Sequence, residues 1–61
     1  MDMNTDDMSR DELLRYADTV DREFRKWLGR SANAARIAGY DGPLAYMLRK
    51  ADALRAKAAT I

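Results

Sequence analysis

The chain has 61 residues, of which 48% are hydrophobic and 34% are charged, and its formal net charge is +1. A chain of this length forms one domain at most, and it buries only about 60% of the surface that its unfolded state exposes. Because it contains neither cysteine nor histidine, disulfides and thiolate metal sites are excluded, and helix packing or oligomerisation must supply the stability.

The apolar pattern excludes two further classes. No apolar run approaches the roughly 20 residues of a membrane span, so we expect no membrane partner. The N-terminus is acidic and lacks an apolar core, so we expect no signal peptide. The absence of cysteine also fits a cytoplasmic protein, which is the predicted location.

The small net charge hides an asymmetry along the chain. Residues 1–23 carry eight acidic and three basic side chains, a balance of −5. Residues 24–61 carry eight basic and two acidic side chains, a balance of +6. A basic C-terminal part is typical of nucleic-acid-binding proteins, although an ordinary solvated helical surface explains the same composition.

Residues 1–8 are polar and acidic without periodicity, and we predict a disordered acidic arm there. A single helical domain is predicted over residues 9–61. Its first helix opens at Ser9 and Glu12, which have the spacing of a capping box. Each side chain of such a box accepts a hydrogen bond from the backbone N–H of the other residue.

Apolar residues then recur at steps of three and four, which predicts one buried helix face. They are Leu13, Tyr16, Ala17, Val20, Phe24, Trp27 and Leu28. Met8 and Leu13 have the spacing of a hydrophobic staple. We expect Phe24 and Trp27 in the core, where replacing Trp27 by alanine would cost about 3–5 kcal/mol. The opposite face pairs acids with bases at i,i+4: Asp11 with Arg15, Asp18 with Arg22, and Asp21 with Arg25.

Gly29 leaves two arrangements open. As a helix stop it separates three helices, predicted over residues 9–28, 31–38 and 43–59, with Ser31 capping the second. As a tolerated glycine it costs about 1 kcal/mol and allows one helix over residues 9–38. The chain is all-α in both cases: a small three-helix, helix-turn-helix-like domain in the first, or a long helical hairpin forming a dimeric bundle in the second.

The stretch from residue 31 to residue 50 has the pattern of a helix-turn-helix unit. Small residues stand where two crossing helices would touch, and Gly39 stands where the first helix must stop. Tyr40 follows as an apolar plug, and Pro43 suits the first turn of a new helix. We expect Ala45 and Leu48 to face back toward the first helix of the unit.

The run Ala34-Ala35-Arg36-Ile37-Ala38-Gly39-Tyr40 resembles the helix-turn-helix of bacteriophage terminase small subunits. Phe24, Trp27 and Leu28 are similar to the aromatic-rich end of the preceding helix in that family. The resemblance covers about a third of the chain and implies a DNA-binding fold. Asp41 stands where the family usually has serine, and the family's oligomerisation and portal-binding regions are missing. The resemblance therefore implies DNA binding more than terminase activity.

The composition argues against an enzyme. Without histidine and cysteine the commonest bases and nucleophiles are missing, and no Gly-rich phosphate loop is present. The acidic side chains have basic neighbours at helical spacing, so a solvated face explains them without catalysis. We expect no catalytic residues, no cofactor and no metal site.

For a double-stranded DNA partner, we expect Tyr46 and Lys50 to project from the last helix into the major groove. Arg30, Arg36 and Arg49 would contact phosphates, which positions a protein on DNA without reading its sequence. For Tyr46, partial packing under the turn is the alternative. Asp41 would repel phosphate, or it would cap the last helix.

The rival function is a helical protein-interaction module that binds and modulates a host or partner protein. Exposed aromatic side chains would mark the binding face of such a module. We also expect a homodimer or a higher oligomer, because the first helix carries more apolar surface than one short partner helix can cover. The predicted dimer or partner interface consists of Leu13, Leu14, Tyr16 and Val20.

Overall fold

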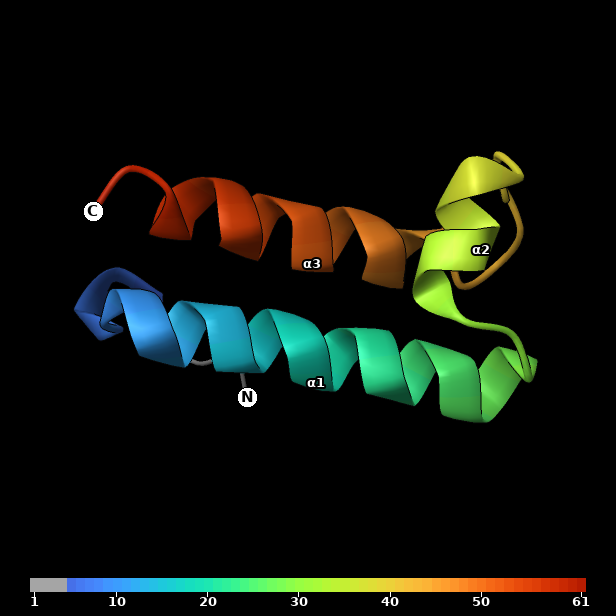
Figure 1. The fold of residues 1–61 in the computed structure, drawn as a ribbon, viewed down its shortest axis with the longest axis horizontal. Coiled ribbons are helices and arrows are strands. Elements are labelled where there is room, and N and C mark those ends of the chain that lie inside the picture. Colours follow the sequence, from blue (N-terminus) through green and yellow to red (C-terminus); the bar gives the residue numbers. More distant parts are fainter. Residues whose placement is uncertain (1–4) are drawn as a thin grey trace.

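A computed structural model describes residues 5–61, which are mostly helical and contain no strand (Figure 1). The elements are a 3₁₀ turn η1 (Thr5–Asp7) and the helices α1 (Arg10–Leu28), α2 (Ala32–Ile37) and α3 (Ala45–Ala58). Within this described part of the chain, no helix has both the length and the apolar character needed to cross a membrane. The predicted all-α class is confirmed.

Local signals in the sequence set both ends of α1. The Ser9 side chain accepts from the backbone N–H of Glu12 (3.2 Å), and the Glu12 carboxylate accepts from the backbone N–H of Ser9 (3.1 Å). Hydrogen bonds from the backbone N–H and the side chain of Ser9 to the carboxylate lower the pKa of the Glu12 carboxyl group. At the other end, Gly29 takes the left-handed conformation (φ 73°), and its N–H donates to the carbonyl of Arg25.

The break at Gly29 decides between the two predicted arrangements. Ser31 caps α2, because its hydroxyl accepts from the backbone N–H of Ala34 (3.1 Å). Three separate helices are therefore confirmed, and the continuous helix over residues 9–38 is wrong. The long helical hairpin that depended on it is wrong for the same reason, since a left-handed residue cannot continue an α-helix.

Helices α1 and α3 run antiparallel side by side, and α2 crosses one end of the pair (Figure 1). One buried cluster lies between α1 and α3, and it includes both residues of the predicted staple. Its buried members are Met8, Leu13, Ala17, Val20, Ala51, Leu54 and Ala58. The alanines on both helices let the two backbones approach closely.

A second cluster fills the end of the pair where α2 crosses. Its buried members are Phe24, Ala32, Ala35 and Leu48, so Leu48 packs near α2 as predicted. Ala45 is buried outside this cluster, and Ala34 and Ala38 of the predicted contact are exposed. The ring of Tyr40 meets Phe24 edge to face, with ring centroids 5.5 Å apart. The Tyr40 hydroxyl also accepts from the backbone N–H of Leu44 (3.4 Å). Tyr40 thus acts as the predicted plug.

The connection from α2 to α3 differs from the prediction. Gly39 is left-handed (φ 69°) as expected, but α3 begins at Ala45 instead of Pro43. The N-cap residue of α3 is Leu44, and no side chain caps this end. The prediction that Asp41 caps the last helix is therefore wrong.

The predicted disordered arm also differs from the structure where it is described. Residues 1–4 of that arm lie outside the described residues. Thr5–Asp7 form the 3₁₀ turn, and Met8 is buried. The Lys57 ammonium group on α3 donates to the Thr5 hydroxyl (3.1 Å) and to the Asp6 carboxylate (2.5 Å). This contact with Lys57 lowers the pKa of the Asp6 carboxyl group.

Candidate functional site

The solvent-facing side of α3 carries the side chains that the sequence suggests for nucleic-acid binding. The buried stripe of α3 is formed by Ala45, Leu48, Ala51, Leu54 and Ala58. Tyr46, Arg49 and Lys50 are exposed, and so are the two alanines that follow them, Ala53 and Ala56. Asp52 of α3 is also exposed, and its carboxylate pairs with Arg36 of α2 at 3.1 Å.

Tyr46 lies in the first turn of α3 and is 57% exposed. The side chain is therefore more exposed than covered, as the DNA-contact prediction requires, and the rest of it is partly packed. Lys50 lies one turn further along the helix. Its ammonium group is 5.1 Å from the ring centroid of Tyr16, which directs the lysine toward the α1 side of the face.

Arg30 lies exposed in the short connection between α1 and α2. It is at the end of the molecule where α2 crosses, and the first turn of α3 lies at that same end (Figure 1). The structure therefore places four of the five predicted DNA-binding residues on exposed surface. Three lie on one face of α3, and Arg30 lies at the end of the molecule where α3 begins.

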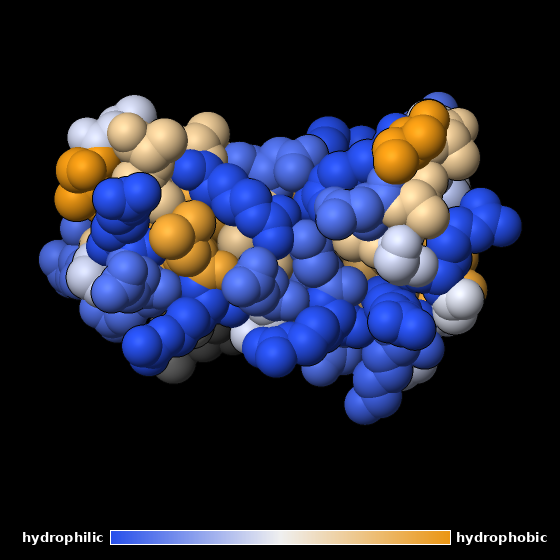
Figure 2. Space-filling model, viewed as in Figure 1, coloured by the Kyte–Doolittle hydropathy of each residue, from blue (hydrophilic) through white to orange (hydrophobic). Residues whose placement is uncertain are grey.

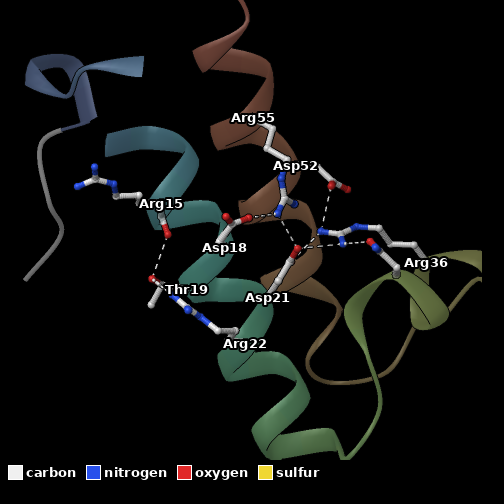
Figure 3. A network of polar contacts seen from close by, with 9 residues as sticks. Arg15, Asp18, Thr19, Asp21, Arg22, Arg36, Asp52 and Arg55 are labelled. Atoms are coloured by element: carbon white, nitrogen blue, oxygen red, sulfur yellow. Dashed lines mark hydrogen bonds and ion pairs between the residues drawn. The ribbon is translucent and has the colours of Figure 1, made fainter. Parts of the chain in front are cut away.

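Arg36 is the fifth, and its guanidinium group is engaged within the fold (Figure 3). It makes two hydrogen bonds to the Asp21 carboxylate, at 2.9 and 3.2 Å, and one to the Asn33 side chain. It also pairs with Asp52 at 3.1 Å. The half-buried guanidinium therefore joins α2 to α1 and α3, and it does not stand on the exposed face of α3 with the other predicted residues.

Asp21 is the centre of this network and is only 18% exposed. Arg55 of α3 donates to Asp21 at 2.8 Å and to Asp18 at 2.9 Å. Partial burial alone would raise the pKa of the Asp21 carboxyl group, but hydrogen bonds from both arginines and their positive charge outweigh it, so the pKa lies below its usual value. The same contacts raise the pKa of Arg55 despite the opposing effect of burial.

Sequence reasoning misses this network. The i,i+4 spacing pairs Asp18 and Asp21 with Arg22 and Arg25 within one helix, and the structure pairs them with α3 and α2 instead. Arg22 donates to Thr19 in the structure. One feature of the sequence could have indicated a contact between helices. Asp21 directly follows Val20 of the apolar face, so it lies at the border of that face, where another helix packs.

The predicted dimer interface lies inside the molecule. Leu13 and Val20 are buried against α3, and Leu14 and Tyr16 are half-buried against the same cluster. The prediction treated this stripe as surplus apolar surface. It is wrong for Leu13 and Val20, because α3 runs along α1 and covers them.

Trp27 is 71% exposed, so its predicted place in the core is wrong. The buried stripe of α1 passes through Ala17, Val20 and Phe24, and a step of four continues it to half-buried Leu28. Trp27 lies beside that stripe. Phe24 is fully buried, as predicted.

No group of three or more acidic side chains within residues 5–61 is arranged to hold a metal ion. A shallow, open hollow of about 180 Å³ lies between α1 and the start of α2. Its lining includes Arg22, Arg25 and Ser31. Such a hollow does not enclose a small molecule in the way that cofactor sites do.

Comparisons of this chain with known protein families, with curated proteins and with solved structures find no match.

Proposed function

We propose that this protein is a small DNA-binding regulatory protein of phage-like type, which acts in the cytoplasm and presents α3 to double-stranded DNA. The observation that carries the proposal is the exposed face of α3 with Tyr46, Arg49 and Lys50, where the one exposed acidic side chain of the helix, Asp52, is paired with Arg36. Arg49 and Lys50 contribute positive charge toward the phosphates, and Tyr46 supplies a contact surface at the leading end of the helix.

Charge separation within the molecule supports this orientation. Asp18, Asp21 and Asp52 are gathered on one flank, where Arg36 and Arg55 hold them (Figure 3). Their negative charge is therefore compensated away from the outer face of α3. A polyanion that approaches that face meets Arg49 and Lys50, and the negative charge of nearby Asp52 is offset by Arg36.

The helix-turn-helix interpretation is part of the same proposal. Its supports are the resemblance of residues 34–40 to terminase small subunits, the left-handed Gly39, and the shared cluster of Ala35 and Leu48. In this interpretation α2 positions α3, and α3 enters the major groove. Arg30 lies at the end where α3 begins and contacts the phosphate backbone.

The test is fluorescence anisotropy of a labelled duplex at two salt concentrations. We expect affinity to fall steeply with salt. The double variant Arg49→Ala/Lys50→Ala should bind weakly, and the slope of its affinity against salt should be smaller by about 0.9 for each phosphate that it no longer neutralises. Asp41→Ser should strengthen binding, because it removes a negative charge from the loop before α3.

Arg10→Ala is the matched control. It also removes an exposed positive charge, but from the first residue of α1 at the opposite end of the molecule. Its affinity should stay close to that of the parent protein. Failure of the folded protein to bind any duplex at low salt would reject the proposal, with helical circular dichroism showing that the protein is folded.

A protein-interaction module is the second candidate, and one observation favours it. Trp27, Ile37 (89% exposed) and Tyr46 come from three different helices, and all lie toward the end of the molecule where α2 crosses. Exposed large hydrophobic residues of this kind can bind a partner protein or a second copy of the chain. Sedimentation velocity over a range of concentrations tests self-association, and Ile37→Ser should abolish any dimer that forms.

A further inference from the structure

Trp27 is an exposed indole among basic side chains. It lies in the last turn of α1, and in the sequence the exposed residues Arg25 and Lys26 precede it and exposed Arg30 follows it. Leu28, its neighbour toward the core, is half-buried against the second cluster. The indole therefore contributes little to the packing that holds the three helices together.

The exposed apolar side chains on the face drawn in Figure 2 are scattered. Protein-binding patches are continuous apolar areas of several hundred Å². On the face drawn in Figure 2, hydrophilic side chains cover most of the surface and the hydrophobic ones form small separate patches. Among the large hydrophobic side chains of α1, only Trp27 is exposed. The exposed charged residues near Trp27 in the sequence are mostly basic. Glu23, one turn earlier on α1, is the acidic residue nearest to Trp27 in the sequence.

An exposed aromatic ring in a basic stretch of the chain matches one ligand chemistry. An unpaired nucleobase offers a π-face of similar size, and the phosphates on either side of it offer negative charge. We propose that Trp27 is a stacking platform for an unpaired base of single-stranded DNA, and that Lys26 and Arg30 contact the adjoining phosphates. Glu23 repels phosphate on its side, so the strand leaves Trp27 toward Arg30.

This inference deepens the proposed DNA-binding function. It rests on that function in one respect, namely that the ligand is DNA. The face of α3 contacts the duplex, and the end of α1 holds a base that has left the duplex. Both surfaces lie at the end of the molecule where α2 crosses (Figure 1). A protein built this way binds preferentially where a duplex has an overhang or an opened base pair.

The chain offers a direct probe, because Trp27 is its only tryptophan. Titration with oligothymidylate should quench the intrinsic tryptophan fluorescence, since a stacked base contacts the indole. A blunt duplex should quench it much less. Trp27→Ala should weaken oligothymidylate binding by about 5-fold to 100-fold while leaving blunt-duplex affinity nearly unchanged. Trp27→Phe, which keeps a smaller ring, should give an intermediate affinity.

Ile37→Ala is the control, because it removes a more exposed apolar side chain from the same end of the molecule. It should change neither affinity. Thermal unfolding followed by circular dichroism should show that Trp27→Ala and Ile37→Ala are both as helical as the parent protein.

Three results would overturn the inference. If Trp27→Ala and the parent protein bind oligothymidylate with equal affinity, the stacking role of Trp27 is rejected. Blunt-duplex binding by the same proteins would still support the proposed function. Equal weakening of single-strand and duplex binding would assign Trp27 to the duplex surface. A fluorescence shift that follows protein concentration and not added DNA would assign Trp27 to a protein contact. Conversely, if Arg49→Ala/Lys50→Ala leaves duplex affinity unchanged and quenching by oligothymidylate persists, the inference stands without the proposed duplex surface.

Discussion

Phe24 and Trp27 are three residues apart on α1, and their side chains have opposite environments. Phe24 is fully buried beside Tyr40 and Leu48, and Trp27 is mostly in solvent. A helical step of three residues rotates a side chain by about 300° around the helix axis, so two such residues share a face only loosely. At the edge of an apolar stripe this small offset decides whether a ring is covered.

The two aromatic residues therefore make a matched pair of substitutions. Phe24→Ala should lower the free energy of unfolding by about 3–5 kcal/mol, which is enough to unfold a domain of this size. Trp27→Ala should change it by less than about 0.5 kcal/mol, as exposed substitutions do. Thermal unfolding of both variants measures the difference. Equal destabilisation would show that Trp27 packs in the core after all.

Asp21 is the polar residue on which the association of the three helices most depends. Asp21→Asn should destabilise the protein by about 1–3 kcal/mol, because Arg36 and Arg55 each lose a charged hydrogen-bond partner. Asp18→Asn is the control, since Asp18 pairs with the same Arg55 but is 66% exposed. It should cost less than about 1 kcal/mol. Urea unfolding at neutral pH compares the two.

The lowered pKa of Asp21 also makes stability depend on pH. The folded state holds fewer protons on this carboxylate than the unfolded state, whose pKa is near the usual 3.8. Its contribution is therefore complete at neutral pH and is lost as pH falls from about 5 through the lower pKa of the folded state. Asp21→Asn should show a smaller loss of stability over that range. An identical acid dependence in the variant would assign the loss to other carboxylates.

At the scale of helices, Gly29 is the residue that separates α1 from α2. It has a positive φ, and a β-carbon built on it would meet no atom within 4 Å. A side chain at residue 29 would therefore destabilise the protein through the backbone conformation and not through a steric clash. The left-handed conformation is what directs the chain out of α1 so that α2 can cross the pair of long helices.

Gly29→Ala should destabilise the protein by about 1–2 kcal/mol, the usual cost of a left-handed alanine. Gly29→Asn should cost less, because asparagine adopts this conformation more readily than other residues with side chains. The order glycine, asparagine, alanine in thermal midpoint is the expected result. A variant with alanine as stable as the parent would mean that α1 can extend past residue 29.

The start of α1, the cap of α2 and the stop at Gly39 were predictable from sequence because their causes are local, whereas the start of α3, which no side chain caps, was not. The capping box at Ser9, the cap at Ser31 and the left-handed glycines each depend on residues within one or two turns. The ion-pair network was not predictable in this way, because Arg36 and Arg55 are 15 and 34 residues from Asp21. The exposure of Trp27 depends on how α1 is rotated against α3. The spacing of apolar residues in the sequence fits Trp27 and Leu28 equally well, so it does not determine that rotation.

For the whole molecule, the antiparallel packing of α1 on α3 explains why one chain covers its own apolar stripe. Three alanines on the facing sides, Ala17, Ala51 and Ala58, are buried in the cluster between the two helices. Their small side chains allow two long helices to share a narrow core. The candidate DNA-binding residues at one end and the Lys57 contacts at the other are then held at fixed positions along one rigid pair.

The contact of Lys57 with Thr5 and Asp6 has a consequence for the order of folding. It joins residues 52 positions apart, whereas the contact between Phe24 and Tyr40 closes only 16 positions. The longer closure costs about 1 kcal/mol more in chain entropy. Association should therefore start where α2 crosses and proceed like a zipper toward the chain ends, which should also fray first. Hydrogen exchange of backbone amides should accordingly be fastest in the last turn of α3 and slowest around Phe24 and Leu48.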